Sequence, residues 1–501
     1  MTDRANFKKK KLILRGGVTL LVMLMLAFPV AAVEFDFGQA HGSIMGYINQ
    51  SVGFNITGGD HFDTQQDFNS AVFQALVETK VHLTPRLRFF GSVSLNADWA
   101  YGLLDGKDDW KAKGFDKADD DRFILGDFDD VLKEFHLTWT PGDFMFRVGK
   151  QVVVWGETDG IRIMDQINPE DQRRGITDVE FESTILPLWL LRAEYFITPD
   201  TEWMTELGFQ FIFNPNVKFR SNESVSVGGD VWGIWGANVM AGPGMSVGSF
   251  DQAIEEPDEW DDEGYEYGFR IRTVMADAIM TLNYFNGVAN TPVTIMTGDP
   301  RIEVSPWDNR LILHLPEAGY YPDLEFVGAT FTRDFPGIYI KALGGVSPVL
   351  RAEIVYAMDS TFTNNLNAFE ELDELQIGIG LDWKFKINFL NPKAYFSLFS
   401  QFVNRKILDY PDYGLSVQSN RKDWIFVMNT TYFHNKLEPA VTYWHDETNN
   451  ADLLKLELGW EYSHKWEYTI GAVFFSGDKD GAGFEPFANK DQFFMTVSHR
   501  F

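Results

Sequence analysis

Residues 144–174 read FMFRVGKQVVVWGETDGIRIMDQINPEDQRR and join two unlike patterns. Up to Trp155 the chain alternates, so that Arg147 and Gln151 share one face of an extended segment and apolar residues share the other. This pattern predicts a strand with one dry face and one wet face. Beyond Trp155 the alternation stops, and large apolar residues such as Ile163 and Ile167 stand among charges. A solvated loop has no need of so many apolar groups, so we expect this one to pack against the protein.

The same alternation recurs along the chain, for example in Leu87 to Trp99 and in Leu375 to Ile387. With the first segment included, about eighteen such strands can be placed. We therefore predict an all-β fold, a transmembrane antiparallel β-barrel of about 18 strands (roughly 16 to 20) with an inward-folded loop at 156–188.

The connections support this topology, because an antiparallel membrane barrel alternates short periplasmic turns with long external loops. Turn formers such as Thr84-Pro85 and Asn391-Pro392 mark the short side, on which only 335–348 is long. An even number of strands places both termini in the periplasm. The predicted external loops are 57–67, 102–130, 156–188, 214–266, 287–324, 359–373, 404–423, 447–452 and 476–490.

The chain begins like an exported protein. Basic residues up to Arg15 precede an apolar run from Val18 to Phe28, and small residues end at Ala32. This is the layout of a secretory signal peptide, so we expect residues 1–32 to be removed and 33–501 to form the barrel. A retained N-terminal anchor is the alternative, although the run is short for a membrane span.

Composition excludes several classes of protein. The 72 Asp and Glu against 43 Lys and Arg give a net charge of -29, which argues against nucleic acid as a partner. An exported chain with no Cys is not a disulfide scaffold. The 44 Phe, 17 Tyr and 15 Trp are a heavy aromatic load, as expected when aromatic girdles lie at two membrane interfaces.

The last segment, Asp491 to Phe501, alternates and ends the chain on an aromatic residue. It resembles the C-terminal signal of Gram-negative outer-membrane barrels, which their assembly machinery reads. The resemblance implies a bacterial outer-membrane location. The partners expected there are outer-membrane lipid, lipopolysaccharide and the barrel-assembly machinery.

Charges of both signs fall on the predicted lumen face. Two Leu-Arg-Ala-Glu fragments each place an Arg and a Glu two positions apart, and therefore on one face. Such charges form either a cross-strand salt-bridge lattice that stiffens the wall or a constriction whose field selects the permeant molecule. The candidate lumen and gate residues are Arg147, Gln151, Trp155, Glu157, Asn168, Asp171, Arg173, Arg174, Arg192, Glu194, Arg270, Arg272, Arg351 and Glu353.

Within the loop, the run Asn168-Pro169-Glu170-Asp171 predicts the start of a helix, with Asn168 as the N-cap. Arg173 and Arg174 would then lie on a short helix inside or over the pore. We expect the segment from Trp155 to Arg174 to act as an inward-folded gate.

Residues 225–250 leave two interpretations open. They hold Trp232 and Trp235 among many glycines, an unusual content for an external loop. They form either an apolar landing surface for a hydrophobic substrate or another β-hairpin that raises the strand number to twenty.

Catalytic motifs are absent from the sequence. The nine His residues are scattered, and neither His-Glu-x-x-His nor Gly-x-Ser-x-Gly is present. Acidic clusters such as 116–121 do not match a full calcium loop with its distal Glu, so they indicate solvated external loops. We expect no enzyme, no metal site and no cofactor. An outer-membrane phospholipase or protease is the weaker hypothesis.

One motif points to a family. The runs Gly149-Lys150-Gln151-Val152-Val153, Trp155-Gly156-Glu157 and Ile167-Asn168-Pro169-x-Asp171 resemble a porin-like outer-membrane family known only as a domain of unknown function, although Lys150 replaces the usual Arg. The resemblance implies traffic of apolar or amphipathic molecules and, as a partner, an inner-membrane transporter of the resistance-nodulation-division type. A substrate channel, a general diffusion porin and a sheath or export conduit for a partner protein all fit.

Lys150 disagrees with the alternation, because it falls on the apolar face of its strand. Either a bulge near Gly149 reverses the parity, or that face meets something other than lipid.

Overall fold

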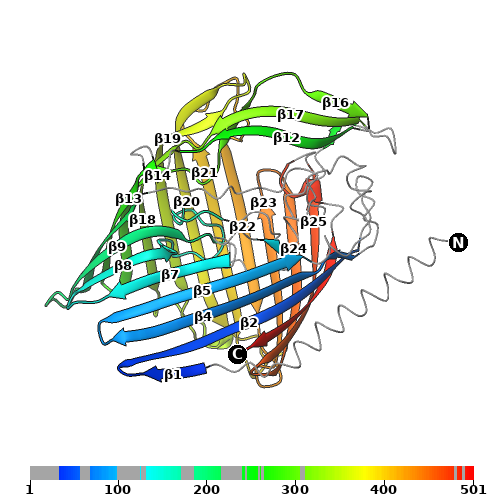
Figure 1. Ribbon diagram of the computed structural model, residues 1–501. Coiled ribbons are helices and arrows are strands. Elements are labelled where there is room, and N and C mark those ends of the chain that lie inside the picture. Colours follow the sequence, from blue (N-terminus) through cyan, green and yellow to red (C-terminus); the bar gives the residue numbers. More distant parts are fainter. Residues whose placement is uncertain are drawn as a thin grey trace.

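The structure of the protein is a computed structural model (Figure 1). It describes residues 33–56, 68–98, 124–125, 131–170, 185–215, 240–242, 245–257, 260, 264–304, 311–478, 482–487 and 491–501. No helix among these residues has the length and apolar content needed to cross a membrane.

Within the described residues, 18 antiparallel strands close on themselves as a barrel, which confirms the predicted fold. β2 (Ala40–Asn55) pairs with β4 on one side and with β26 on the other, and so joins the first wall strand to the last. Three short strands, β1 (Val33–Phe37), β3 (Phe68–Ser70) and β6 (Ile124–Leu125), extend this sheet. The other wall strands are β4 (Val72–Thr84), β5 (Leu87–Asp98), β7 (Leu132–Trp139), β8 (Phe144–Gln151), β9 (Leu188–Ile197), β10 (Met204–Asn214), β13 (Glu266–Met275), β14 (Ala278–Val288), β18 (Asp323–Asp334), β19 (Val349–Thr363), β20 (Phe369–Phe385), β21 (Phe396–Ile407), β22 (Asn420–Asn429), β23 (Leu437–Asp446), β24 (Ala451–Ser463), β25 (Trp466–Gly477) and β26 (Gln492–Arg500).

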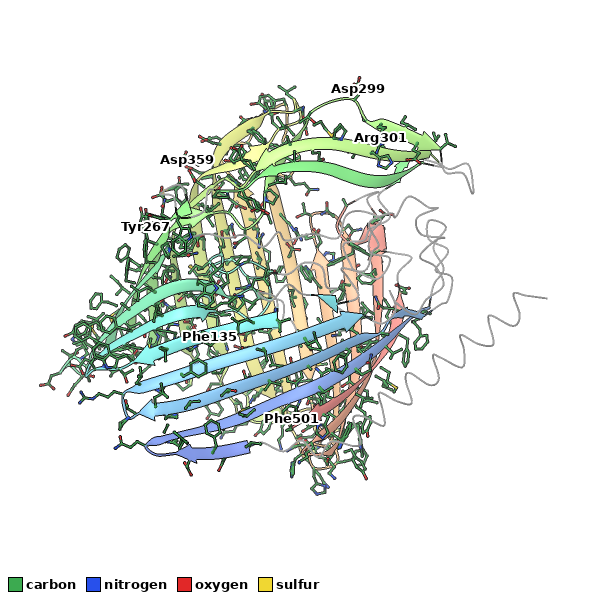
Figure 2. All side chains as sticks on the ribbon, viewed as in Figure 1. Phe135, Tyr267, Asp299, Arg301, Asp359 and Phe501 are labelled. Carbon is green, nitrogen blue, oxygen red and sulfur yellow. The ribbon has the colours of Figure 1, made fainter. Side chains whose placement is uncertain are left out.

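The two faces of the wall differ in polarity because successive side chains of a strand point to opposite sides. On β14, Leu282 is 62% exposed, whereas its neighbours Thr281 and Asn283 are buried on the other face. Phe135 of β7, labelled in Figure 2, is another exposed apolar side chain. An apolar outer face around a closed wall is the arrangement of a membrane barrel, in which every backbone group must find its partner within the sheet.

The connections are mostly short at one end of the barrel and mostly long at the other, but the predicted loops 359–373 and 404–423 were too long. Residues 359–373 were expected to form an external loop, whereas β19 and β20 continue until only 364–368 connects them. Neighbouring segments hold this hairpin. The Thr363 hydroxyl donates to the carbonyl of Thr294 at 2.6 Å, and the Asn367 side chain bonds both backbone groups of Met296.

Two long external connections form a second sheet over the barrel, at the end opposite Phe501 (Figures 1 and 2). It contains β11 (Met240–Gly242), β12 (Met245–Glu255), β15 (Val293–Met296), β16 (Arg301–Val304) and β17 (Leu311–Tyr320), and its β12 and β17 run parallel. Of the two interpretations of 225–250, the hairpin that would add two strands to the barrel is therefore wrong for β11 and β12, which pair in this other sheet. Residues 225–239 lie outside the described residues.

The strand contains no bulge at Lys150. Gly149 adopts a φ of +129°, which favours glycine, and a Cβ there would lie 2.1 Å from the carbonyl oxygen of Phe135. Both ladders keep their register through this point, so no residue is inserted. Lys150 and Gln151 are both buried, and the alternation of exposure ends at Gly149.

Phe501 closes the seam between β2 and β26. Its N–H donates to the carbonyl of Gly46 at 2.9 Å, and its own carbonyl accepts from the Gly46 N–H at 2.8 Å. The Phe501 ring lies so near the strand that a Cβ on Gly46 would be 2.8 Å from it. The terminal residue therefore contributes both backbone pairing and packing where the barrel joins.

Deleting Phe501 removes these contacts, so we expect an exported chain that fails to form a stable barrel in the membrane. Heat-modifiable migration of the protein in outer-membrane fractions measures this. Phe493→Leu changes an exposed side chain on β26 and serves as the control. A normal amount of heat-modifiable barrel from the deletion variant would contradict the role given to Phe501.

Candidate functional site

The segment that follows β8 lies on the inner face of the barrel wall. It leaves β8 after Gln151, runs through residues 152–170 and meets the returning chain at a bridge between Glu170 and Ile185, just before β9. The N–H of Leu186 also donates to the carbonyl of Pro169 at 2.8 Å. We call residues 152–170 the inward loop. Their position confirms the predicted inward fold.

Apolar side chains anchor the inward loop to the wall. Trp155, Met164 and Ile167 are buried in one cluster with Phe285 of β14, Phe326 of β18 and other wall residues. The Trp155 ring meets the Phe285 and Phe326 rings edge-on, at centroid distances of 6.4 and 6.5 Å. The lumenal wall under the loop is therefore apolar, unlike an interior that faces water.

Glycines in the wall make room for this packing. A Cβ at Gly268 would lie 2.6 Å from the Trp155 ring, and one at Gly328 would lie 2.5 Å from the end of the Met164 side chain. A larger residue at Gly268 would push against the rigid Trp155 ring, whereas one at Gly328 would displace the flexible end of the Met164 side chain.

Two polar side chains brace the inward loop internally. Asp165 accepts hydrogen bonds from the N–H groups of Trp155 and Gly156, at 2.5 and 2.8 Å. Asn168 accepts from the N–H of Val153 at 2.8 Å and donates to the carbonyl of Leu186 at 2.9 Å. The prediction of Asn168 as a helix N-cap was wrong, because the next residues form the β-bridge and the Asn168 side chain is used to cross-link two chain segments.

Side chains from two distant strands bind the backbone of the inward loop. Glu353 of β19 accepts from the N–H groups of Glu157 and Thr158, at 2.5 and 2.8 Å. Gln401 of β21 bonds both backbone groups of Ile161, accepting at 2.6 Å and donating at 2.9 Å. These bonds satisfy loop groups that no strand partner reaches.

Arginines add further contacts to loop carbonyls. Arg351 donates to the carbonyl of Glu157 at 2.5 Å and also pairs with Asp382 of β20 at 2.6 Å. Arg405 of β21 donates to the carbonyl of Arg162 at 3.1 Å. The two members of the Arg351 and Glu353 fragment therefore bind the loop and β20.

Polar side chains of β9, β10 and β13 bind Trp155 and its neighbours in the loop. Its indole N–H donates to Gln210 of β10 at 2.6 Å, and the Gln210 amide donates in turn to Glu194 at 2.5 Å. Arg192 forms an ion pair with the same Glu194 on β9. Arg270 of β13 donates to the carbonyl of Val154 at 3.1 Å and to Glu157 at 3.3 Å.

The structure thus brings six of the candidate residues together on the loop and the wall beneath it: Trp155, Glu157, Asn168, Arg270, Arg351 and Glu353. Gln151, Arg192 and Glu194 adjoin them. Arg147 bonds Thr138, and Arg272 pairs with Glu206, so these two make no hydrogen bond or ion pair with the inward loop. Asp171, Arg173 and Arg174 lie outside the described residues.

Sequence reasoning missed Asp165, Gln210, Gln401 and Arg405. Asp165 stood in the quoted loop, but nothing in the pattern indicated that its carboxylate would turn back on Trp155. The other three lie on strands far along the chain, and only the closure of the barrel brings them to the loop.

One family model matches almost the whole chain. The family described as "Protein of unknown function (DUF1302)" matches residues 13–501. No curated protein matches the chain.

Three solved structures are similar over most of their length. Acinetobacter baumannii OccAB3 has a TM-score of 0.49 at 8% identity, with 92% of this chain and 99% of that chain covered. Pseudomonas aeruginosa OpdK with vanillate has a TM-score of 0.44 at 8% identity, covering 92% and 98%. Salmonella typhi OmpF in complex with daunomycin has a TM-score of 0.43 at 9% identity, covering 94% and 100%.

Trp155→Ala should release the inward loop, because removing a fully buried Trp costs about 3–5 kcal/mol. Trypsin should then cut the folded barrel after Arg162, whose side chain is buried and bonded to Glu170 in the docked loop. Mass spectrometry of the fragments measures the cut, and Trp460→Ala, at an exposed position on β24, is the control. Equal resistance of wild type and Trp155→Ala would show that Trp155 does not anchor the loop.

Proposed function

We propose that this chain, which belongs to the DUF1302 family, is a channel of the bacterial outer membrane for small hydrophobic or amphipathic molecules, and that the 156–188 loop gates it. The observation that carries this proposal is the inward loop fixed on the lumenal wall. A barrel of about eighteen strands is wide enough to hold water unless loops narrow it. A docked loop is a direct means of narrowing it.

The closed wall supports the membrane location. Its exposed outer face is rich in large apolar side chains, and a closed barrel leaves no unpaired edge in lipid. We further propose that residues 1–32 are a signal peptide that is cut off during export. The barrel-assembly machinery, lipopolysaccharide and an inner-membrane transporter of the resistance-nodulation-division type are the partners that we propose for the mature barrel.

The contacts of the inward loop favour a narrowed pore on one side of the lumen. They extend along the wall from Leu190 of β9 to Gln401 and Arg405 of β21. A loop spread along one arc of the wall would leave a passage against the facing arc, whose lumen side includes Lys455 and Glu457 of β24. These two pair with each other at 2.9 Å.

A second apolar cluster holds the connection between β25 and β26 to the wall. Phe484 and Phe487 of this connection pack against Leu453 and Phe475, and all four side chains are buried. A general diffusion porin is one alternative to the proposed channel. A sheath or export conduit for a partner protein is the other alternative, and it would give no stable small-molecule conductance of its own.

Glu353→Ala tests the gate, because it leaves two buried loop N–H groups without their acceptor at a cost of about 1–3 kcal/mol each. In planar bilayers we expect larger or noisier conductance than wild type, together with altered uptake of a small apolar probe. Glu353→Gln keeps one carbonyl acceptor and should restore most of the wild-type behaviour.

Glu371→Ala is the matched control, since it removes an exposed carboxylate near the start of β20 that does not bind the loop. Conductance steps that are identical in wild type and Glu353→Ala would contradict the proposal that the loop is a gate. A wild-type barrel that inserts but gives no conductance steps would contradict the channel function and favour the sheath.

A further inference from the structure

A row of three arginines crosses the inner wall beside the inward loop. The strand pairings place Arg88 of β5 opposite Thr138 of β7, Thr138 opposite Arg147 of β8, and Arg147 opposite Arg192 of β9. The row faces the lumen, because the adjacent residues Leu137, Val148 and Leu191 are exposed on the outer face. We call Arg88, Arg147 and Arg192 the arginine row.

Two members of this row form no ion pair among the described residues. Arg192 is paired with Glu194, whereas the one printed hydrogen bond of the Arg147 side chain goes to the Thr138 hydroxyl, at 3.1 Å, and Glu134 and Glu194 attract Arg147 from beyond ion-pair distance. Among the residues that the structure describes, no carboxylate oxygen lies within 4.0 Å of the guanidinium of Arg88 or Arg147.

Three other lumenal arginines near the loop form ion pairs with carboxylates. Arg270 pairs with Glu157, Arg272 with Glu206 and Arg351 with Asp382. In a chain of net charge -29, acidic side chains are abundant, so the wall supplies counter-ions to these three while leaving Arg88 and Arg147 without an ion pair among the described residues. A local positive surplus of this kind attracts anions from the lumen.

The spacing of the row suits a carboxylate. Arg88 and Arg147 are two strands apart, or about 10 Å at the usual strand spacing, and their long side chains can converge on one anion. A guanidinium binds a carboxylate through two parallel N–H bonds. Phe90, two residues after Arg88 on the same face, lies between His136, on which it stacks at 5.3 Å, and the Lys80 ammonium at 5.6 Å from the ring centroid, so an aromatic ring and a further cation stand beside the row.

We propose that the arginine row is a binding site for an organic carboxylate, with the carboxylate on Arg147 and Arg88 and its apolar part against Phe90. This rests on the proposed channel function and narrows its substrates to amphipathic anions. Glu194 pairs with Arg192 and accepts a hydrogen bond from Gln210, and Gln210 in turn accepts from the Trp155 indole. The proposed site therefore lies next to Gln210, which binds Trp155.

The test compares benzoate with benzyl alcohol, which have the same ring but differ in charge. Wild type, Arg88→Gln and the Arg88→Gln/Arg147→Gln double variant are inserted in liposomes for probe influx and in planar bilayers for the reversal potential in a KCl gradient. Lys341→Gln, which removes an exposed cation in the connection between β18 and β19 and not in the lumen, is the control. Arg88 is exposed and makes no ion pair among the described residues, so the single variant keeps the test valid if the double variant folds poorly.

We expect the double variant to admit benzoate at least roughly fivefold more slowly than wild type and to shift its reversal potential toward cation selectivity. Arg88→Gln should show a smaller change in the same direction. Benzyl alcohol influx should be the same in all variants, and the control variant should match wild type in benzoate influx and reversal potential.

Unchanged benzoate influx in both arginine variants, with a wild type that conducts, would overturn the arginine row alone. A wild type that conducts nothing and admits neither probe faster than protein-free liposomes do would instead overturn the channel function on which this proposal rests.

Discussion

The inward loop depends on one constraint, which is that a non-repetitive segment inside a barrel must satisfy its backbone N–H and C=O groups without a strand partner. Glu353 and Gln401 reach the loop backbone from the wall, and Asp165 and Asn168 do so from within the loop. A buried N–H that loses its acceptor costs about 1–3 kcal/mol. This is why short polar contacts are concentrated along one arc of the lumen.

That constraint divides the inner wall into two surfaces. Under the loop the wall is apolar, and Phe285 and Phe326 meet Trp155 while Gly268 and Gly328 give it and Met164 space. Beside the loop the wall stays polar and carries the arginine row. The docked loop covers the apolar arc, so the surface left to the lumen on this side is the charged one.

The cations of the lumen divide along the same line. Arg270 and Arg351 bind loop carbonyls as well as carboxylates, so their charge is consumed in holding the structure together. An ion pair of this kind contributes little net stability, but removing one partner leaves the other charge buried without a partner. Among the described residues, Arg88 and Arg147 form no ion pair and bind no loop carbonyl, so their charge is available to a ligand.

The barrel could be predicted from the residues alone, because alternation and turn chemistry are local and each strand carries them in full. The inward turn of the loop after Trp155 could be predicted in the same way, since the apolar residues there need a dry surface. What the loop binds could not be predicted, because its partners lie on distant strands. Gln401 and Arg405 approach Ile161 and Arg162 through closure of the wall, and the arginine row arises from strand register across four strands. Register and closure are properties of paired strands, and no single segment of the chain encodes them.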